Sequence, residues 1–176
     1  MSRTTRRFGR PHLLDDHAIG LEARAEHDDH LSLKLWLRLL ACSTQVETEV
    51  RQRLRSGFGI SLARFDYLAQ LHRHADGLSM STLSRYLMVT GGNVTALTDE
   101  LEREGLVQRD SDPDDRRSWR LRMTAAGRKA FDRIAREHEQ WVIELFAGLD
   151  TAQKQSLYEG LGRLRVQMAA TQDKAA

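Results

Sequence analysis

Apolar residues recur at helical spacing over the first well-patterned part of the chain, from Leu31 to about Arg55. Two glycines directly behind it, Gly57 and Gly59, predict the end of this helix. The segment before it, residues 1–29, is polar and charged and has few apolar side chains to bury. We therefore expect these residues to form an N-terminal arm rather than a domain.

Two more long helices are predicted at the other end of the chain. Thr124 is a candidate N-cap for the first, whose apolar positions run from Phe131 to Leu149. Asp150 or Thr151 caps the second, which carries a stripe of apolar residues on one face: Leu157, Leu161, Leu164 and Met168. The small region between the long helices cannot cover all these stripes, so we expect them to pack against the same helices of a second copy.

The middle of the chain is patterned as three short helices. Ser61 is a candidate N-cap for the first helix and Ser79 for the second, with a turn at residues 76–77 between them. A tight turn then leads to Thr90, the candidate N-cap of the third helix, and Gly105 predicts its end.

A β-hairpin is predicted directly after the third short helix. Its strands are Leu106–Arg109 and Trp119–Met123, and the acidic run with a proline at residues 112–115 is a strong turn sequence. Two short helices joined by a tight turn and followed by a hairpin make a winged helix-turn-helix. The fold class expected is mainly α with a small two- or three-stranded β-wing.

The run from Thr90 to Thr124, TGGNVTALTDELEREGLVQRDSDPDDRRSWRLRMT, resembles the MarR family of bacterial transcription regulators. The resemblance extends from about residue 30 to about residue 168. It implies a DNA-binding winged domain over residues 61–124 and a helical dimerisation region formed by residues 30–60 and 125–172. The function implied is that of a homodimeric, sequence-specific repressor that binds a palindromic DNA operator.

Composition indicates which other classes of protein the sequence does not fit. Lysine and arginine number 27 against 25 acidic residues, and this net charge of +2 is too small to indicate DNA binding by itself. No apolar stretch approaches the ~18 to 20 residues of a membrane span, and no secretory signal is seen. The single cysteine, Cys42, excludes an internal disulfide framework and fits a reducing cytoplasm.

Small polar residues at the start of the helix after Thr90 are candidates for contacts to DNA. Two glycines there would let the backbone approach the DNA closely, an asparagine can hydrogen-bond adenine, and a threonine can contact a thymine methyl group. With two phosphate-binding candidates from the preceding helix, the set is Ser81, Thr82, Thr90, Gly91, Gly92, Asn93 and Thr95. The alternative is that these are ordinary residues of a helix start.

The predicted wing carries the sequence Asp115-Arg116-Arg117, which matches the Asp-x-Arg signature of MarR-like wings. The resemblance implies that Arg117 enters the minor groove and that Asp115 holds the loop by pairing with an arginine, with Arg116 as a second candidate. A solvated charged hairpin is the alternative. Three further arginines on the strands are candidates for phosphate contacts: Arg109, Arg120 and Arg122.

The resemblance also implies a small aromatic or phenolic effector bound between the dimerisation helices and the winged domain. The segment TGGNVTALTDELE resembles the corresponding segment in regulators of aromatic-acid breakdown, including those that respond to hydroxycinnamoyl-CoA thioesters. The residues that could supply an apolar cleft and a cation for a carboxylate are Trp36, Arg38, Arg64, Phe65, Tyr67, His72 and Trp141. For each of them, core packing or a solvated surface is the alternative.

Other functions stay open as alternatives or are excluded by missing motifs. Cys42 lies among leucines and is expected to be buried, which disfavours a peroxide-sensing repressor. The sequence has no Walker loop, dinucleotide fingerprint, nucleophile elbow or metal-ligand spacing, so no enzyme activity, cofactor or metal is expected. The remaining alternative is a helical interaction protein whose wing binds protein, which predicts weak, salt-insensitive binding to DNA.

Overall fold

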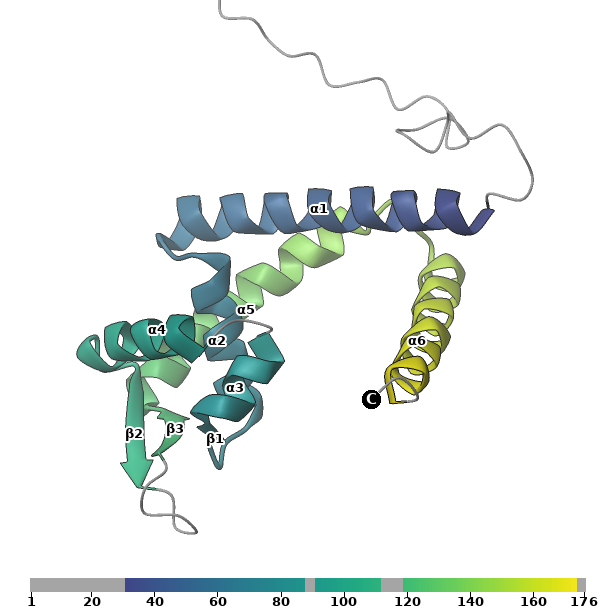
Figure 1. Cartoon of the computed structure of the whole chain (residues 1–176). Helices are drawn as coiled ribbons and strands as arrows, with labels where there is room; N and C mark the ends of the chain where they lie inside the picture. Colours follow the sequence, from purple (N-terminus) through teal and green to yellow (C-terminus); the bar gives the residue numbers. More distant parts are fainter. Residues whose placement is uncertain (1–30, 88–90, 112–118, 174–176) are drawn as a thin grey trace, which may run out of the picture. The chain divides into compact units, whose positions relative to one another are not determined.

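The computed structural model describes residues 31–87, 91–111 and 119–173 (Figure 1). The chain divides into two compact units, one that ends at Glu49 and one that begins at Val50. The second unit contains the sheet and most of the helices, and it holds every buried side chain of the described residues.

The first helix, α1, spans Leu31–Phe58 and crosses the division between the units. None of its side chains is buried before Val50, which is followed by a second buried residue, Leu54. The helix runs slightly further than predicted, since Gly57 is still helical. It ends where Gly59 adopts a φ of 67°, a left-handed backbone conformation that glycine adopts without strain.

Three short helices follow in the second unit: α2 (Leu62–Arg73), α3 (Met80–Leu87) and α4 (Gly91–Arg103). The predicted N-caps of the first two are confirmed. The Ser61 hydroxyl accepts a hydrogen bond of 3.2 Å from the backbone N–H of Arg64, and the Ser79 hydroxyl accepts one of 3.2 Å from that of Thr82.

The recognition-type helix α4 ends as its sequence predicts. Gly105 lies in the left-handed region with φ 71°, its N–H donates to Glu102 O, and the N–H of Leu106 donates to Leu101 O. This pair of bonds is a Schellman motif, which satisfies carbonyls at the helix end. The motif turns the chain directly into the hairpin.

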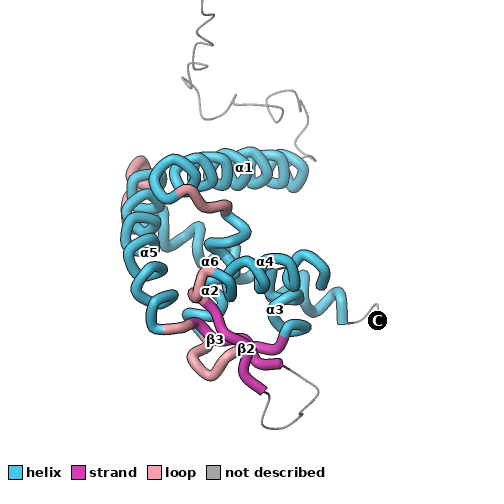
Figure 2. The backbone as a smooth tube through the Cα atoms, turned by 90° about the vertical axis from the view of Figure 1, so that its left-hand side faces the viewer, coloured by secondary structure: helices cyan, strands magenta, loops and turns pink. Residues whose placement is uncertain are grey.

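The sheet has three antiparallel strands in the order β1-β3-β2: β1 (Leu78–Ser79), β2 (Val107–Ser111) and β3 (Trp119–Met123). The hairpin pairs Val107 with Met123 and Ser111 with Trp119. Figure 2 shows the strands (magenta) at one end of this unit, next to α3. The expected mainly α fold with a small β-wing is confirmed, with three strands rather than two.

The core of the second unit is built around α2. This helix packs against α3, α5 and β3, and α4 packs against α3 and β2. Fully buried side chains come from all these elements except α5 and from the end of α1: Leu54, Tyr67, Leu68, Leu71, Leu83, Val94, Thr98, Leu101, Val107 and Leu121. Helix α2 is therefore the central element that fixes α3 and α4 in place.

Two long helices complete the chain: α5 (Ala125–Leu145) and α6 (Thr151–Asp173). Thr124 caps α5 as predicted, since its hydroxyl accepts from the N–H of Gly127 at 3.0 Å. Of the two candidate N-caps for α6, the structure selects Asp150. Its carboxylate accepts a hydrogen bond from Gln153 N at 2.8 Å, and the Gln153 side chain accepts one from Asp150 N at 2.9 Å.

The long helices leave much apolar surface uncovered. Helix α6 has no buried residue, and the exposed large apolar side chains on it are Leu157, Tyr158, Leu161, Leu164, Val166 and Met168. The first part of α1 exposes Leu31, Leu33, Leu35, Trp36 and Leu40. No helix of the described residues is long and apolar enough to span a membrane.

Candidate nucleic-acid interface

The start of α4 presents a polar face built from small residues. Gly91, Gly92, Asn93 and Thr95 are exposed, whereas Val94 between them is buried. A β-carbon added at either glycine would meet nothing within 4 Å. The exposed turn is therefore free to receive a DNA backbone or base edge, and the N-terminus of a helix favours a phosphate.

Helix α3 holds the two other described candidates in a network around Ser79. The Ser79 hydroxyl lies 3.0 Å from that of Ser81 and donates to that of Thr82 at 2.9 Å. Ser81 is exposed, but Thr82 is half-buried. Ser81 is thus the more accessible of the two for a phosphate contact.

Four of the predicted DNA contacts lie outside the described residues: Thr90, Asp115, Arg116 and Arg117. Their roles at the cap of α4 and at the wing tip stay predictions.

The inner face of α4 is attached to α2 through a buried pair of hydroxyls. Tyr67 and Thr98 are both fully buried, and their side-chain oxygens lie 2.6 Å apart. The Thr98 hydroxyl donates to Val94 O at 2.7 Å, so the shared hydrogen comes from Tyr67. Burial raises the pKa of Tyr67 to about 12. Tyr67 is therefore a core residue that contacts α4, and its role as a ligand contact stays a prediction.

Arg109, a candidate for a phosphate contact, forms ion pairs within the protein. This arginine on β2 forms ion pairs with Asp99 and, at 2.6 Å, with Glu102, both on α4. The hydrogen bond to Asp99 raises the pKa of the Arg109 guanidinium. These ion pairs neutralise the charge of Arg109 and connect β2 to α4.

Arg64 on α2 also forms ion pairs with acidic residues of α4 and of the turn after it. Its guanidinium binds Glu104 through both terminal nitrogens, one at 2.7 Å, and binds Glu100 at 2.9 Å. Its side chain is only 14% exposed. The hydrogen bond raises the pKa of Arg64 and lowers that of Glu104. Arg64 thus pairs with acidic residues of α4 and of the turn after it, and its role as the cation for an effector carboxylate stays a prediction.

Arg122 on β3 is partly engaged as well. Its Nε donates to the backbone carbonyl of Asp76 at 3.1 Å, and the carboxylate of Asp110 lies 3.6 Å away.

Two exposed aromatic side chains on α3 and β3 were not predicted as site residues. Trp119 begins β3, and Tyr86 on α3 stacks on His74. Exposed rings of this size are a feature that sequence periodicity alone does not distinguish from core positions.

The remaining effector candidates of the second unit belong to a chain of ring contacts between α2 and α5. Phe65 is buried and packs 4.5 Å from His138 and 5.4 Å from Phe131, measured between ring centroids. Trp141 lies 6.0 Å from the ring of Phe58. This packing assigns Phe65 to the core and leaves Trp141 half-buried at its edge.

His72 lies at the other end of the same chain of rings. It is exposed, contacts the Phe131 ring at 4.9 Å and pairs with Asp132 at 3.0 Å. Burial lowers the pKa of His138, further along the cluster.

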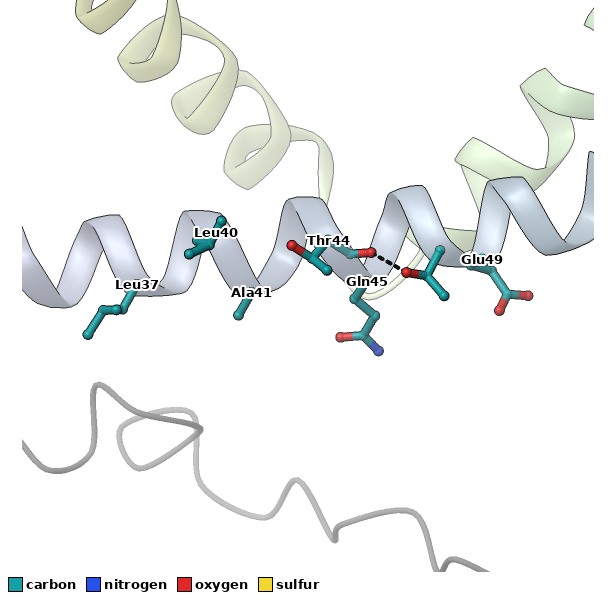
Figure 3. Close-up of a pocket in the computed structure, with 7 residues that line it drawn as sticks. Leu37, Leu40, Ala41, Thr44, Gln45 and Glu49 are labelled. Atoms are coloured by element: carbon teal, nitrogen blue, oxygen red, sulfur yellow. Dashed lines mark hydrogen bonds between the residues drawn. The ribbon is translucent and has the colours of Figure 1, made fainter. Parts of the chain in front are cut away.

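Trp36 and Arg38 lie on the first part of α1, in the other unit, and both are exposed. A pocket on this part of α1 is lined by other residues of the helix (Figure 3): Leu37, Leu40, Ala41, Thr44, Gln45, Thr48 and Glu49. None of the predicted effector contacts lines it. The seven candidates fall in both units, and their role in one effector site stays a prediction.

The expectation that Cys42 is buried is wrong for the single chain. Cys42 is exposed, because the helix around it has no buried residue before Val50. The leucines that flank it in sequence are exposed or half-buried too.

Comparison with known proteins matches this geometry. Residues 58–118, from the end of α1 to the residue before β3, fit the model of the MarR family. The chain is 32% identical over 107 residues to the HTH-type transcriptional regulator YdgJ of Bacillus subtilis (strain 168), covering 61% of this chain and 65% of YdgJ. It is 31% identical over 119 residues to the transcriptional activatory protein BadR of Rhodopseudomonas palustris, covering 66% and 67%. The matches thus span about two thirds of these relatives.

Two solved structures extend the comparison over most of the chain. A MarR family transcriptional regulator from Silicibacter pomeroyi is 32% identical, with a TM-score of 0.64 over 83% of this chain and 99% of that one. Sco3205 from Streptomyces coelicolor, solved in complex with DNA, shares the fold at 23% identity, with a TM-score of 0.68 over 80% of this chain and 89% of that one. These relatives are transcriptional regulators rather than enzymes. The chain belongs to the MarR family of winged helix-turn-helix, DNA-binding transcriptional regulators.

Proposed function

We propose that the protein is a homodimeric regulator that reads a pseudo-palindromic operator of roughly 16 to 20 base pairs. The observation that carries this proposal is the exposed polar start of α4, set on a helix whose other face is buried. In the complex, the α4 helices enter successive major grooves through Asn93 and Thr95. The wings place Arg117 in the flanking minor grooves.

The uncovered apolar surface supports the dimer. Leu157, Leu161, Leu164 and Met168 recur every three or four residues along α6, and each is exposed in the single chain. A stripe of this length on a water-soluble helix is stabilised by burial against a partner. A second copy is the partner we propose, since a two-fold dimer matches two inverted half-sites.

Repression by blocking polymerase is the mode of action we propose, with release by a small aromatic acid or its CoA thioester. Such a ligand acts only if it binds more tightly to a dimer whose two α4 helices are wrongly spaced for the operator. The ring cluster between α2 and α5 supports this choice, because it borders the elements that hold α4.

Activation is the second candidate, and the similarity to BadR, named as an activatory protein, favours it. The two modes share the operator contacts and differ in where the operator lies relative to the promoter. A reporter gene under the native promoter separates them, since deletion of the regulator raises expression in one case and lowers it in the other.

Substitution of the wing arginine tests the DNA contact directly. Arg117→Ala is expected to weaken operator binding by roughly 1 to 3 kcal/mol without changing the unfolding temperature, because one groove contact is lost. Arg136→Ala, which removes an exposed arginine of α5, is the control and is expected to bind as the wild type does. Equal affinities for the Arg117 variant and the wild type would rule out the wing contact.

A further inference from the structure

The second half of α4 carries a charge that conflicts with DNA binding. Four of the six residues from Asp99 to Glu104 are carboxylates, and only Arg103 among them is basic. Carboxylates near the C-terminus of a helix oppose the helix dipole, and they repel the phosphates of any DNA that the helix approaches. A recognition helix with this sequence requires cations from elsewhere.

Arg64 supplies one of these cations from α2. It is 36 residues from Glu100 and 40 from Glu104 in sequence, so this ion pair exists only in the folded unit. The pair with Glu104 uses both terminal nitrogens, a geometry that fixes direction as well as distance. Since the Arg64 side chain is 14% exposed, its charge faces α4 rather than solvent.

The same turn of α2 also carries the contacts to α5. Phe65, next to Arg64 in sequence, packs on Phe131 and His138, and Tyr67 holds Thr98 of α4. Helix α2 thus contacts α4 with one face and α5 with another. The rotation of α4 about its own axis is set by the buried hydroxyl pair near its middle and by Arg64 near its end.

We infer that Arg64 is a positioning residue for operator binding. It neutralises Glu100 and Glu104 and sets the orientation of α4, while it touches neither DNA nor effector. The inference rests on the proposed function, in which the exposed start of α4 reads the operator. It gives Arg64 a role that neither its charge nor its place in the sequence indicates.

Removal of Arg64 and of its partners in turn tests this role. Arg64→Met is expected to lower operator affinity roughly tenfold, within the range for residues that couple neighbouring elements. The triple variant R64M/E100Q/E104Q is expected to bind about threefold more tightly than Arg64→Met, since no uncompensated carboxylate remains, but less tightly than the wild type, since the contact that orients α4 is still missing. Arg136→Met is the control for loss of one positive charge.

The salt dependence separates charge neutralisation from a general packing defect. The ratio of wild-type to Arg64→Met affinity should fall between low and moderate salt, because ions screen the repulsion between the freed carboxylates and the phosphates. A packing defect would lower affinity by the same factor at both salt concentrations. If Arg64→Met fails to fold, Arg64→Lys replaces it, since lysine keeps the charge but loses the paired geometry.

Failure of the Arg64 role and failure of the proposed function would give different results. An operator affinity in the triple variant no higher than that of Arg64→Met would overturn the inference, since it would show that the freed Glu100 and Glu104 carboxylates do not oppose DNA binding. An unchanged affinity in Arg64→Met would overturn it as well. Wild-type protein without sequence preference would instead contradict the proposed function.

Discussion

The hydroxyl pair of Tyr67 and Thr98 is the clearest case of a single contact that fixes the reading helix. The Tyr67 hydroxyl donates to Thr98, and Thr98 donates onward to the Val94 carbonyl, so both groups are satisfied inside the core. Removal of one hydroxyl does not have the same effect as removal of the other. Removal of the tyrosine hydroxyl leaves Thr98 with its own acceptor, whereas removal of the threonine hydroxyl leaves a buried donor without one.

We therefore predict different costs for the two substitutions. Tyr67→Phe should lower the free energy of unfolding by about 0.5 to 1.5 kcal/mol, and Thr98→Val by about 1 to 3 kcal/mol. The double variant should cost less than the sum. Urea unfolding at one fixed protein concentration measures all three, with Tyr158→Phe on the exposed face of α6 as the control. Strict additivity would show that the two hydroxyls do not interact.

His138 gives the protein a dependence on pH. Burial among aromatic rings holds the pKa of His138 below its ordinary value of 6.5. The unfolded chain then takes up a proton more readily than the folded one, so stability falls as the pH drops below 6.5. The unfolding temperature of the wild type should fall more between neutral and mildly acidic pH than that of His138→Phe. Parallel curves for the two proteins would remove His138 as the cause.

Single residues were predictable from sequence where the cause is local. The N-caps Ser61, Ser79 and Thr124 depend on the next few residues, and the exposed Asn93 follows from helical periodicity. Arg64 and Arg109 were not predictable, because their partners are set by packing and not by spacing. The exposure of Cys42 was missed for the same reason, since burial of a helix face depends on its partner.

At the scale of elements, the long helices and the hairpin followed from periodicity and turn sequences. The structure differs mainly at boundaries: α1 runs to Phe58, and β2 spans Val107–Ser111 rather than Leu106–Arg109. Helix ends depend on which carbonyls find donors, a balance that propensity resolves only to a residue or two. The short strand β1 went unpredicted because two residues carry no periodicity.

The same substitution should act oppositely at two glycines. Gly92 has no neighbour within 4 Å of a built β-carbon, whereas at Gly127 that carbon would lie 2.1 Å from the carbonyl oxygen of Leu106. Gly92→Ala should stabilise the protein by roughly 0.5 to 1 kcal/mol through helix propensity, yet weaken operator binding because a methyl group then separates α4 from the DNA. Gly127→Ala should destabilise it by about 1 to 3 kcal/mol, since α5 must move away from the hairpin.

Thermal unfolding and operator titration of both variants check these expectations. If Gly92→Ala binds the operator as tightly as the wild type, the backbone of α4 does not approach the DNA at this turn. If Gly127→Ala is as stable as the wild type, the close contact between α5 and Leu106 is not required.

At the scale of the whole molecule, the apolar face of α6 should hold the dimer together. Leu161→Glu places a charge in the middle of this face and is expected to give a monomer by sedimentation equilibrium. Operator affinity should fall with it, because two linked half-site contacts become two separate ones. Ala170→Glu adds the same residue on the opposite face of α6 and should remain dimeric. A Leu161→Glu variant that stays dimeric would place the interface elsewhere.

Selection of bound duplexes from a random DNA pool measures whether the protein binds a specific sequence as a dimer. We expect enrichment of one inverted repeat with half-site centres about one helical turn apart, and retention of that preference from low to moderate salt. Its positions in the genome would then identify the regulated genes. A pool without an enriched repeat, or binding that is lost uniformly as salt rises, would contradict the account and leave the winged fold to non-specific or protein contacts.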